Sequence, residues 1–310
     1  MIVLWGISDD GPMLAVRQEL ARRGAPVIFV DQFSVDTVAV DLEADSPLSG
    51  VLEVGGRGYG LGDVGAFYLR PYDSARVAAA RSADAAMKIE AARVDDALLL
   101  FAELTPTIVV NRPSAMASNG SKPLQAALIA REGFDVPETL LTTDAEAAEE
   151  FRDRHGGAIY KSASGVRSRV ALLDDAALGR LAGAACPLQL QSRIPGVDHR
   201  VHVVGDDIFP AVVTSSAVDY RYPGADGEAP EIASCEIPVD IAGRCVALTR
   251  ALGLCLSGVD LRRTPEGRWF CFEVNPSPAY TFYEEATGAP ITAALAALLA
   301  AQGVCKTWPG

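Results

Sequence analysis

Two carboxylates and an amide lie in two hydrophobic, strand-forming runs near the carboxyl end of the chain. Asp260 lies in the run 257–262, and Glu273 and Asn275 lie in the run 269–275. Strict alternation along the second run sends Cys271, Glu273 and Asn275 to one face, and opposed residues of antiparallel neighbours lie about 5 Å apart. Oxygen ligands of this kind suit Mg²⁺, which takes its remaining ligands from water and nucleotide phosphates. The alternative is a pair of solvated surface acids.

Basic residues elsewhere in the chain have the positions that recognition of an anion needs. Lys122 opens a predicted helix, and Lys161 ends a predicted strand. Arg200 lies within another strand, and Arg221 follows the turn-like segment V-D-Y. Such cations, together with magnesium held by carboxylates, position and neutralise a nucleotide in phosphoryl transfer. Taken singly, each cation is more often only a solvated charge.

Several other chemistries are disfavoured. His199 and His202 point to opposite faces of their strand, which argues against a shared zinc ion. The 6 cysteines form no C-x-x-C pair and fit buried free thiols better than a disulfide framework. No G-x-x-x-x-G-K-[ST] occurs, so a P-loop is excluded. The match to G-x-G-x-x-G at 60–65 precedes a strand instead of joining a strand to a helix, so we interpret it as a flexible loop.

Composition narrows the function classes further. A chain of 310 residues with 49% hydrophobic residues predicts two or three packed units. A net charge of −13 argues against a nucleic-acid partner. The start of the chain lacks the basic region of a signal peptide, and no apolar run reaches the roughly 18 residues that a membrane span needs. These features predict a cytoplasmic protein with no membrane partner.

The elements that must position the site follow from hydrophobic periodicity. Strands at 2–7 and 25–30 enclose a helix at 13–23, which is the pattern of a βαβ unit. Strands at 66–70 and 108–111 surround an alanine-rich helical run at 75–101. Residues 1–112 are therefore predicted to form a small N-terminal α/β domain.

The rest of the chain reads as α+β structure. The predicted helices are 121–133, 144–154, 241–252 and 291–302. The predicted strands are 158–162, 168–173, 188–191, 199–204, 209–213, 257–262 and 269–275. They divide into a compact unit at 113–187 and a strand-rich unit at 188–310.

The order of the motifs identifies a family. Lys122 is followed by E-G-F-D-V-P-E-T, Y-K-S-A-S-G, Q-S-R-I-P-G-V-D-H-R-V-H-V-V-G, S-G-V-D-L and E-V-N-P-S-P between residues 111 and 300. This order resembles the ATP-grasp superfamily in its RimK-like and glutathione-synthetase-like branch. The most specific part is D…E-x-N with two spaced lysines. R-P at Arg70 and N-R-P at Asn111 also resemble the peptide-macrocyclising members that make microviridin-type graspetides.

The resemblance implies an ATP-grasp architecture, of mixed α/β and α+β class. An N-terminal α/β (pre-ATP-grasp) domain would cover 1–112. A central lid subdomain at 113–187 and a C-terminal subdomain at 188–310, which carries the metal site, would hold ATP between them. A loop at 162–169 would fold over the nucleotide and exclude water.

The resemblance also implies a role for each site residue. Lys122 and Lys161 would hold the ATP phosphates. Asp260, Glu273 and Asn275 would bind Mg²⁺ or Mn²⁺. Arg200 and Arg221 would stabilise the transferring phosphoryl group or the acyl phosphate. The hinge that receives adenine through backbone groups would consist of Gln191, Ser192, Arg193 and Ile194.

The function predicted from this resemblance is an ATP- and Mg²⁺-dependent carboxylate–amine ligase that forms an amide through an acyl phosphate. Its partners would be small-molecule or peptide carboxylates and amines, and a homodimer is a further expectation. One alternative is a peptide macrocyclase that forms side-chain ester or amide links. Another is a nucleotide-binding protein without ligase activity. The aromatic segment 279–285, with Tyr280 and Tyr283, either lines the substrate site or packs in the core.

Overall fold

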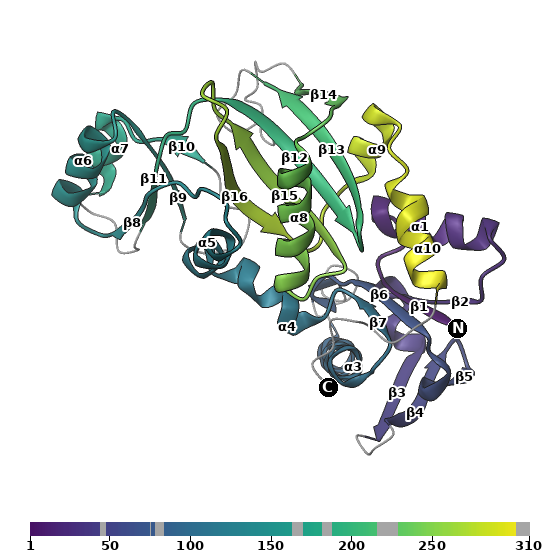
Figure 1. The fold of residues 1–310 in the computed structure, drawn as a ribbon. Coiled ribbons are helices and arrows are strands. Elements are labelled where there is room, and N and C mark those ends of the chain that lie inside the picture. Colours follow the sequence, from purple (N-terminus) through teal and green to yellow (C-terminus); the bar gives the residue numbers. More distant parts are fainter. Residues whose placement is uncertain are drawn as a thin grey trace.

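The computed structural model describes residues 1–43, 48–74, 76–77, 84–162, 170–181, 188–215 and 229–301. The strands among them form four sheets, with orders β2-β1-β6-β7, β3-β4-β5, β10-β9-β11-β8 and β14-β13-β12-β15-β16. In Figure 1 the five-stranded sheet, which carries the predicted metal ligands, lies between the units built on the two four-stranded sheets.

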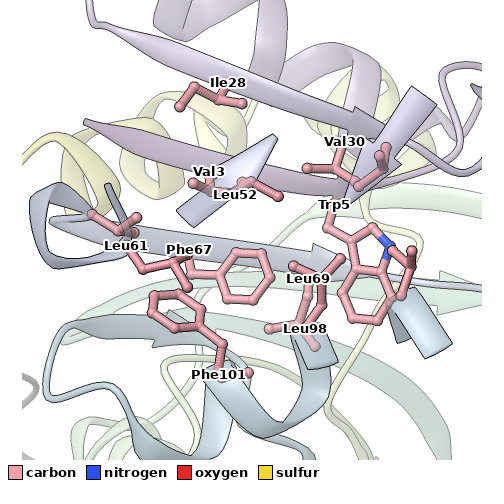
Figure 2. Packing of buried hydrophobic residues seen from close by; sticks show 14 of the residues in the cluster. Val3, Trp5, Ile28, Val30, Leu52, Leu61, Phe67, Leu69, Leu98 and Phe101 are labelled. Atoms are coloured by element: carbon pink, nitrogen blue, oxygen red, sulfur yellow. The ribbon is translucent and has the colours of Figure 1, made fainter. Parts of the chain in front are cut away.

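The N-terminal unit is built on a parallel sheet. Its strands are β1 (Ile2–Gly6), β2 (Val27–Asp31), β6 (Ala66–Arg70) and β7 (Ile108–Val110). Helices α1 (Gly11–Arg22) and α3 (Ala85–Leu104) cover its two faces, so the strands are mainly apolar, as expected for a parallel sheet. Figure 2 shows Phe67 of the sheet beside Phe101 of α3, with ring centroids 5.7 Å apart. The predicted βαβ unit is confirmed.

A small antiparallel sheet beside this unit was not predicted. It consists of β3 (Val38–Glu43), β4 (Ser49–Val54) and β5 (Arg57–Gly60), and the 3₁₀ turn η1 (Gln32–Thr37) leads into it. Gly55 and Gly56 join β4 to β5 with φ of 59° and 78°, which is the turn that a Gly-Gly pair favours in a hairpin. A short 3₁₀ turn, η2 (Leu61–Asp63), then leads into strand β6. The G-x-G-x-x-G match therefore lacks the helix that a dinucleotide site needs.

The central unit carries helices on one face of an antiparallel sheet. Its strands are β8 (Thr139–Thr142), β9 (Ala158–Ser162), β10 (Ala171–Leu172) and β11 (Leu188–Ser192), and its helices are α6 (Ala145–Arg154) and α7 (Asp175–Leu181). Phe151, Leu178 and Leu190 form the core between sheet and helices. Strand β11 pairs with both β8 and β9, so residues 188–192 share a sheet with the central unit.

The C-terminal unit contains the five-stranded antiparallel sheet. Its strands are β12 (Val197–Val204), β13 (Asp207–Thr214), β14 (Glu231–Ser234), β15 (Leu256–Arg263) and β16 (Trp269–Asn275). Helices α8 (Val239–Ala251) and α5 (Lys122–Arg131) pack on one face through Ile129, Cys245 and Leu248. A helical link made of α4 (Pro113–Met116) and η3 (Ala117–Gly120) joins β7 to α5.

The last helices return to the N-terminal unit. Helix α9 (Thr281–Thr287) follows the end of β16, and α10 (Ile291–Ala300) packs against α1, as Figure 1 shows. Leu295 and Leu299 of α10 share a core with Leu4 and Met13. The N-terminal and C-terminal units therefore share one of their hydrophobic clusters. No helix in the described ranges is long and apolar enough to cross a membrane.

The expected strict alternation along 270–275 was wrong. Asp260 is opposite Glu273, but the next residue of β15, Leu261, is opposite Cys271, so Phe272 is an extra residue in a β-bulge. Cys271 consequently lies in the core. The ring of Phe272 packs under the guanidinium of Arg262, whose Cζ is 5.2 Å from the ring centroid. The bulge leaves Glu273 opposite Asp260.

Candidate active site

The register of β15 and β16 brings the three predicted metal ligands together. Asp260 is opposite Glu273, and Asn275 is opposite Gly258, two residues before Asp260. Pro276 follows at once, and the backbone N–H of Ser277 donates to Asn275 Oδ1 at 2.9 Å. The amide of Asn275 is therefore held at the strand end by the turn that follows it.

Arg200 lies on the other side of Asp260. Strand β12 places it opposite this aspartate, and its Nη1 donates to Asp260 Oδ1 at 2.5 Å. The side chain of Arg200 is 7% exposed, and that of Asp260 is 20% exposed. The guanidinium occupies the space of a side chain at Gly258, because a Cβ added there would be 1.9 Å from its Nη2. A glycine at this position is required for the observed path of Arg200.

The two histidines of β12 lie on opposite faces, as predicted. His202 is fully buried, packs its ring 4.8 Å from that of Tyr283, and its Nε2 accepts from Arg200 Nε at 3.4 Å. Burial, and next the charge of Arg200, hold the pKa of His202 well below its usual value, so the ring is neutral. His199 instead packs against Trp269, with ring centroids 4.8 Å apart. The two rings therefore share no ligand site.

Lys122 reaches the site from the start of helix α5. Its Nζ forms a hydrogen-bonded ion pair with Glu273 Oε1, and both side chains are largely buried. Gln125, one turn later, fixes the helix to the strand: its Nε2 donates to Val274 O at 2.8 Å, and its Oε1 accepts from Val274 N at 3.1 Å. The pairing of α5 with β16 thus places this lysine beside the predicted metal ligands.

Lys161 lies on the central sheet, and the predicted hinge starts at the end of strand β11 and continues two residues beyond it. Lys161 is buried on β9, opposite Gln189 of β11. The N–H of Ser192 donates to Glu138 O at 2.9 Å, and that of Arg193 donates to Gly157 O at 3.3 Å. A base contact through these two N–H groups would compete with existing hydrogen bonds. Ile194 O accepts from Arg262 Nη1 at 2.9 Å.

Two polar features near these residues were missed. Gln189 is 0% exposed, and among the described residues neither atom of its amide has a hydrogen-bond partner. Gln191, which belongs to the predicted hinge, lies two residues further along β11, and its Nε2 is 3.2 Å from Thr139 Oγ1. Arg262 forms a two-bond ion pair with Asp198, both contacts being 2.7 Å. The alternation in L-Q-L-Q is a signal that should have drawn attention to Gln189.

The remaining predicted residues divide into two groups. Arg221 and the loop residues 163–169 lie outside the described residues. Tyr280 and Tyr283 are buried, and burial raises the pKa of the Tyr280 hydroxyl above its usual value. Tyr280 shares a core with Leu4, and Tyr283 packs with Val213, so both rings contribute to packing, the second of the two expected roles.

The donor set fits a magnesium ion. It offers two carboxylates and one amide oxygen, which are hard ligands. Within the described ranges no group of three or more His, Cys, Asp or Glu side chains is placed to hold a metal ion. Among the described residues, Asp260 pairs with Arg200 and Glu273 pairs with Lys122, so these four charges balance. A divalent cation added to these four described side chains would need a further anion, and the phosphates of a nucleotide would be suitable.

Comparison with known proteins identifies the family. Residues 119–299, more than half of the chain, match the RimK-like ATP-grasp domain. A probable alpha-L-glutamate ligase from Parasynechococcus marenigrum (strain WH8102) is 28% identical over 195 residues. That match covers 58% of this chain and 41% of the relative, so the chain spans about two fifths of that protein's length.

Solved structures match over nearly the whole chain. The ATP-grasp ligase PsnB, complexed with a minimal precursor, is 27% identical with a TM-score of 0.79, covering 97% of this chain and 98% of PsnB. The macrocyclase MdnC, bound with the precursor peptide MdnA from Microcystis aeruginosa MRC, has the same fold at 21% identity and a TM-score of 0.78, covering 96% and 98%. The predicted ATP-grasp fold is confirmed, and the chain belongs to the RimK-like ATP-grasp family.

Proposed function

We propose that this protein is an ATP- and Mg²⁺-dependent ligase that activates a carboxylate as an acyl phosphate and joins it to a nucleophile. The observation that carries the proposal is the balanced cluster of Arg200, Asp260, Glu273 and Lys122. It combines ligands for a cation with cations for an anion at one place. This combination is what transfer of a phosphoryl group requires.

Each residue of the cluster has a distinct part in the proposed reaction. Asp260, Glu273 and Asn275 would hold magnesium, which, when bound, neutralises charge on the nucleotide phosphates. Lys122 and Lys161 would bind phosphate oxygens, and Arg200 would stabilise charge on the group in transfer. A substrate carboxylate oxygen attacks the γ-phosphorus and ADP leaves. The nucleophile then attacks the acyl carbon, loses its proton, and phosphate leaves.

The substrate we propose is a peptide. PsnB has been solved with the precursor peptide PsnA2, and its likeness to this chain extends over the N-terminal unit as well as the ATP-grasp units. An amide and an ester both remain open as the product, because an acyl phosphate reacts with an amine or with a hydroxyl. A second candidate is the transfer of free glutamate, which the similarity to the probable alpha-L-glutamate ligase favours.

Product analysis separates these possibilities. The purified protein is incubated with MgATP and either a synthetic peptide rich in Glu, Asp, Lys and Thr, or free L-glutamate with an amine-bearing peptide. A ligase that links side chains within a peptide should release ADP only when the peptide is present, and the peptide should lose the mass of one water for each link formed. A glutamate ligase should instead add glutamyl residues. Hydroxylamine cleaves an ester product and leaves an amide intact. Nucleotide binding without ADP release under every condition would contradict the proposed activity.

Lys161→Ala is expected to weaken ATP binding by about 1.5 to 3 kcal/mol, the range for hydrogen bonds to charged groups, which is roughly ten- to a hundredfold in Kd. The physical reason is that Lys161 is buried on β9 and, in its proposed role, holds a phosphate oxygen. Calorimetric titration with ATP measures the effect. Lys88→Ala, in helix α3 of the N-terminal unit, is the matched control and should leave Kd unchanged. Equal affinity for ATP in the Lys161 variant would exclude the phosphate contact.

A further inference from the structure

Arg70 connects the N-terminal unit to the end of the metal-binding strand. It is the last residue of β6, and Pro71 follows it. Its Nη1 donates to Ser277 Oγ at 2.9 Å and to Pro278 O at 3.0 Å. These contacts cross 207 and 208 positions of the sequence. One guanidinium therefore holds the turn that follows β16 from a different unit of the molecule.

Asp10 fixes the other edge of the same guanidinium. Arg70 Nε is 2.7 Å from Asp10 Oδ2, and Nη2 is 3.3 Å from Oδ1, so the ion pair uses two bonds. The side chains are 9% and 8% exposed. Asp10 is also the N-cap of α1, since its Oδ2 accepts from Met13 N at 3.1 Å. The orientation of Arg70 is thus set by the start of a helix as well as by a carboxylate.

The contact continues from Arg70 to Asn275. Ser277 accepts from Arg70 through its hydroxyl, and its backbone N–H donates to Asn275 Oδ1. Prolines on both sides of Ser277 restrict the backbone of this turn. Asn111 also holds this turn, because its Nδ2 donates to Pro276 O at 2.6 Å. A displacement of Ser277 would therefore move the amide oxygen that we assign to the metal.

We propose that Arg70 is a positioning residue for the metal site, acting through Ser277 on the amide of Asn275. The inference rests on the proposed function, because it takes Asn275 as a metal ligand. It assigns the N-terminal unit a part in the chemistry: the relative position of that unit and the five-stranded sheet sets the geometry of one ligand. Partners that orient a ligand in this way commonly change metal affinity about 10- to 100-fold when they are removed.

Manganese binding provides the test, with a readout that is separate from turnover. Mn²⁺ is titrated into the protein with saturating ADP, and free Mn²⁺ is followed by its electron paramagnetic resonance signal. Arg70→Lys keeps the charge beside Asp10 but loses the planar fork that reaches Ser277 and Pro278. We expect it to raise the Mn²⁺ Kd about tenfold, at the lower end of the range for orienting partners. Ser277→Ala should have a similar effect, and the double variant should add little more.

The matched control removes another link between the same two units. Arg23 Nη2 donates to Ala293 O at 3.0 Å, joining α1 to α10 without reaching the metal-binding strand. Arg23→Ala should therefore leave Mn²⁺ affinity unchanged. Asn275→Ala, measured alongside, must weaken Mn²⁺ binding. If it does not, the metal assignment fails and the inference fails with it.

A different result would overturn the inference alone. If Asn275→Ala weakens Mn²⁺ binding while a folded Arg70→Lys protein binds Mn²⁺ normally, Arg70 is only an interdomain tie. Arg70 is likewise only a tie if Arg23→Ala and Arg70→Lys lower metal affinity equally, because loosening of the two units would then explain both. Thermal melting of each variant establishes that the protein compared is folded.

Discussion

Glu273→Gln is expected to abolish turnover while the protein stays folded. Glutamine has nearly the same shape as glutamate but carries no charge, so it removes the anionic and potentially bridging ligand of the proposed metal site. It also leaves the ammonium group of Lys122 beside a neutral amide. Electrostatic repulsion between Lys122 and the incoming cation is then no longer offset. Release of ADP with MgATP and the peptide substrate measures the loss.

The variant needs a control in the same hairpin. Glu266 is exposed in the turn between β15 and β16, so Glu266→Gln removes one negative charge a few residues away without touching the site. It should retain full activity. Circular dichroism and thermal melting show whether Glu273→Gln has the wild-type fold. A folded Glu273→Gln protein with near-normal turnover would refute the assignment of this residue to the metal.

The sequence was most informative where one local pattern determines one element. Strand β16 was predicted with its observed bounds, because Trp269–Asn275 is an aromatic and β-branched run that Pro276 ends. Helix α6 was predicted over 144–154 and is observed at Ala145–Arg154, with Asp144 as its N-cap. Such signals lie within a few residues of each other, so a single sequence contains them in full.

The bulge at Phe272 shows where local patterns end. Alternation assigns Cys271 to the face of Glu273, yet the thiol lies in the core. The face that Cys271 takes depends on two contacts. The guanidinium of Arg262, on the neighbouring strand, packs on the Phe272 ring, and the carbonyl of Asp135 accepts from Cys271 N at 2.9 Å. Neither partner is adjacent in sequence. The register of two strands, not the run itself, decides which face each side chain takes.

The same limit applies to the site as a whole. The residue types and their proposed roles follow from the motifs, but the pairing of Lys122 with Glu273 spans 151 positions. The contacts of Arg70 with the turn after β16 span still more. Only the packing of α5 on the sheet and of the N-terminal unit on the C-terminal unit brings these groups together. Gly258 was likewise part of a motif, S-G-V-D-L, without any sequence signal that it makes room for Arg200.

Arg200→Ala is expected to lower kcat about 10²- to 10³-fold, the range for losing a donor that stabilises transition-state charge. The Kd for ATP should change much less, because Lys122 and Lys161 are the proposed ground-state contacts. Mg²⁺ binding should not weaken, since the guanidinium of Arg200 no longer competes with a cation for Asp260 Oδ1. Steady-state rates and calorimetry with MgATP separate these quantities. A loss confined to ATP affinity would contradict a role in the transfer step.

Gly258→Ala tests the same role by shape alone and leaves every charge in place. The new methyl group would lie 1.9 Å from Arg200 Nη2, so the guanidinium must leave its position beside Asp260. The rate should fall towards that of Arg200→Ala, and Gly258→Ala in the Arg200→Ala background should cost little more, because the group it displaces is already absent. Gly243→Ala in helix α8 adds the same methyl where nothing lies within 4 Å, and it should keep wild-type activity. If Gly258→Ala is folded and fully active, the position of Arg200 over this glycine is not the one that supports transfer.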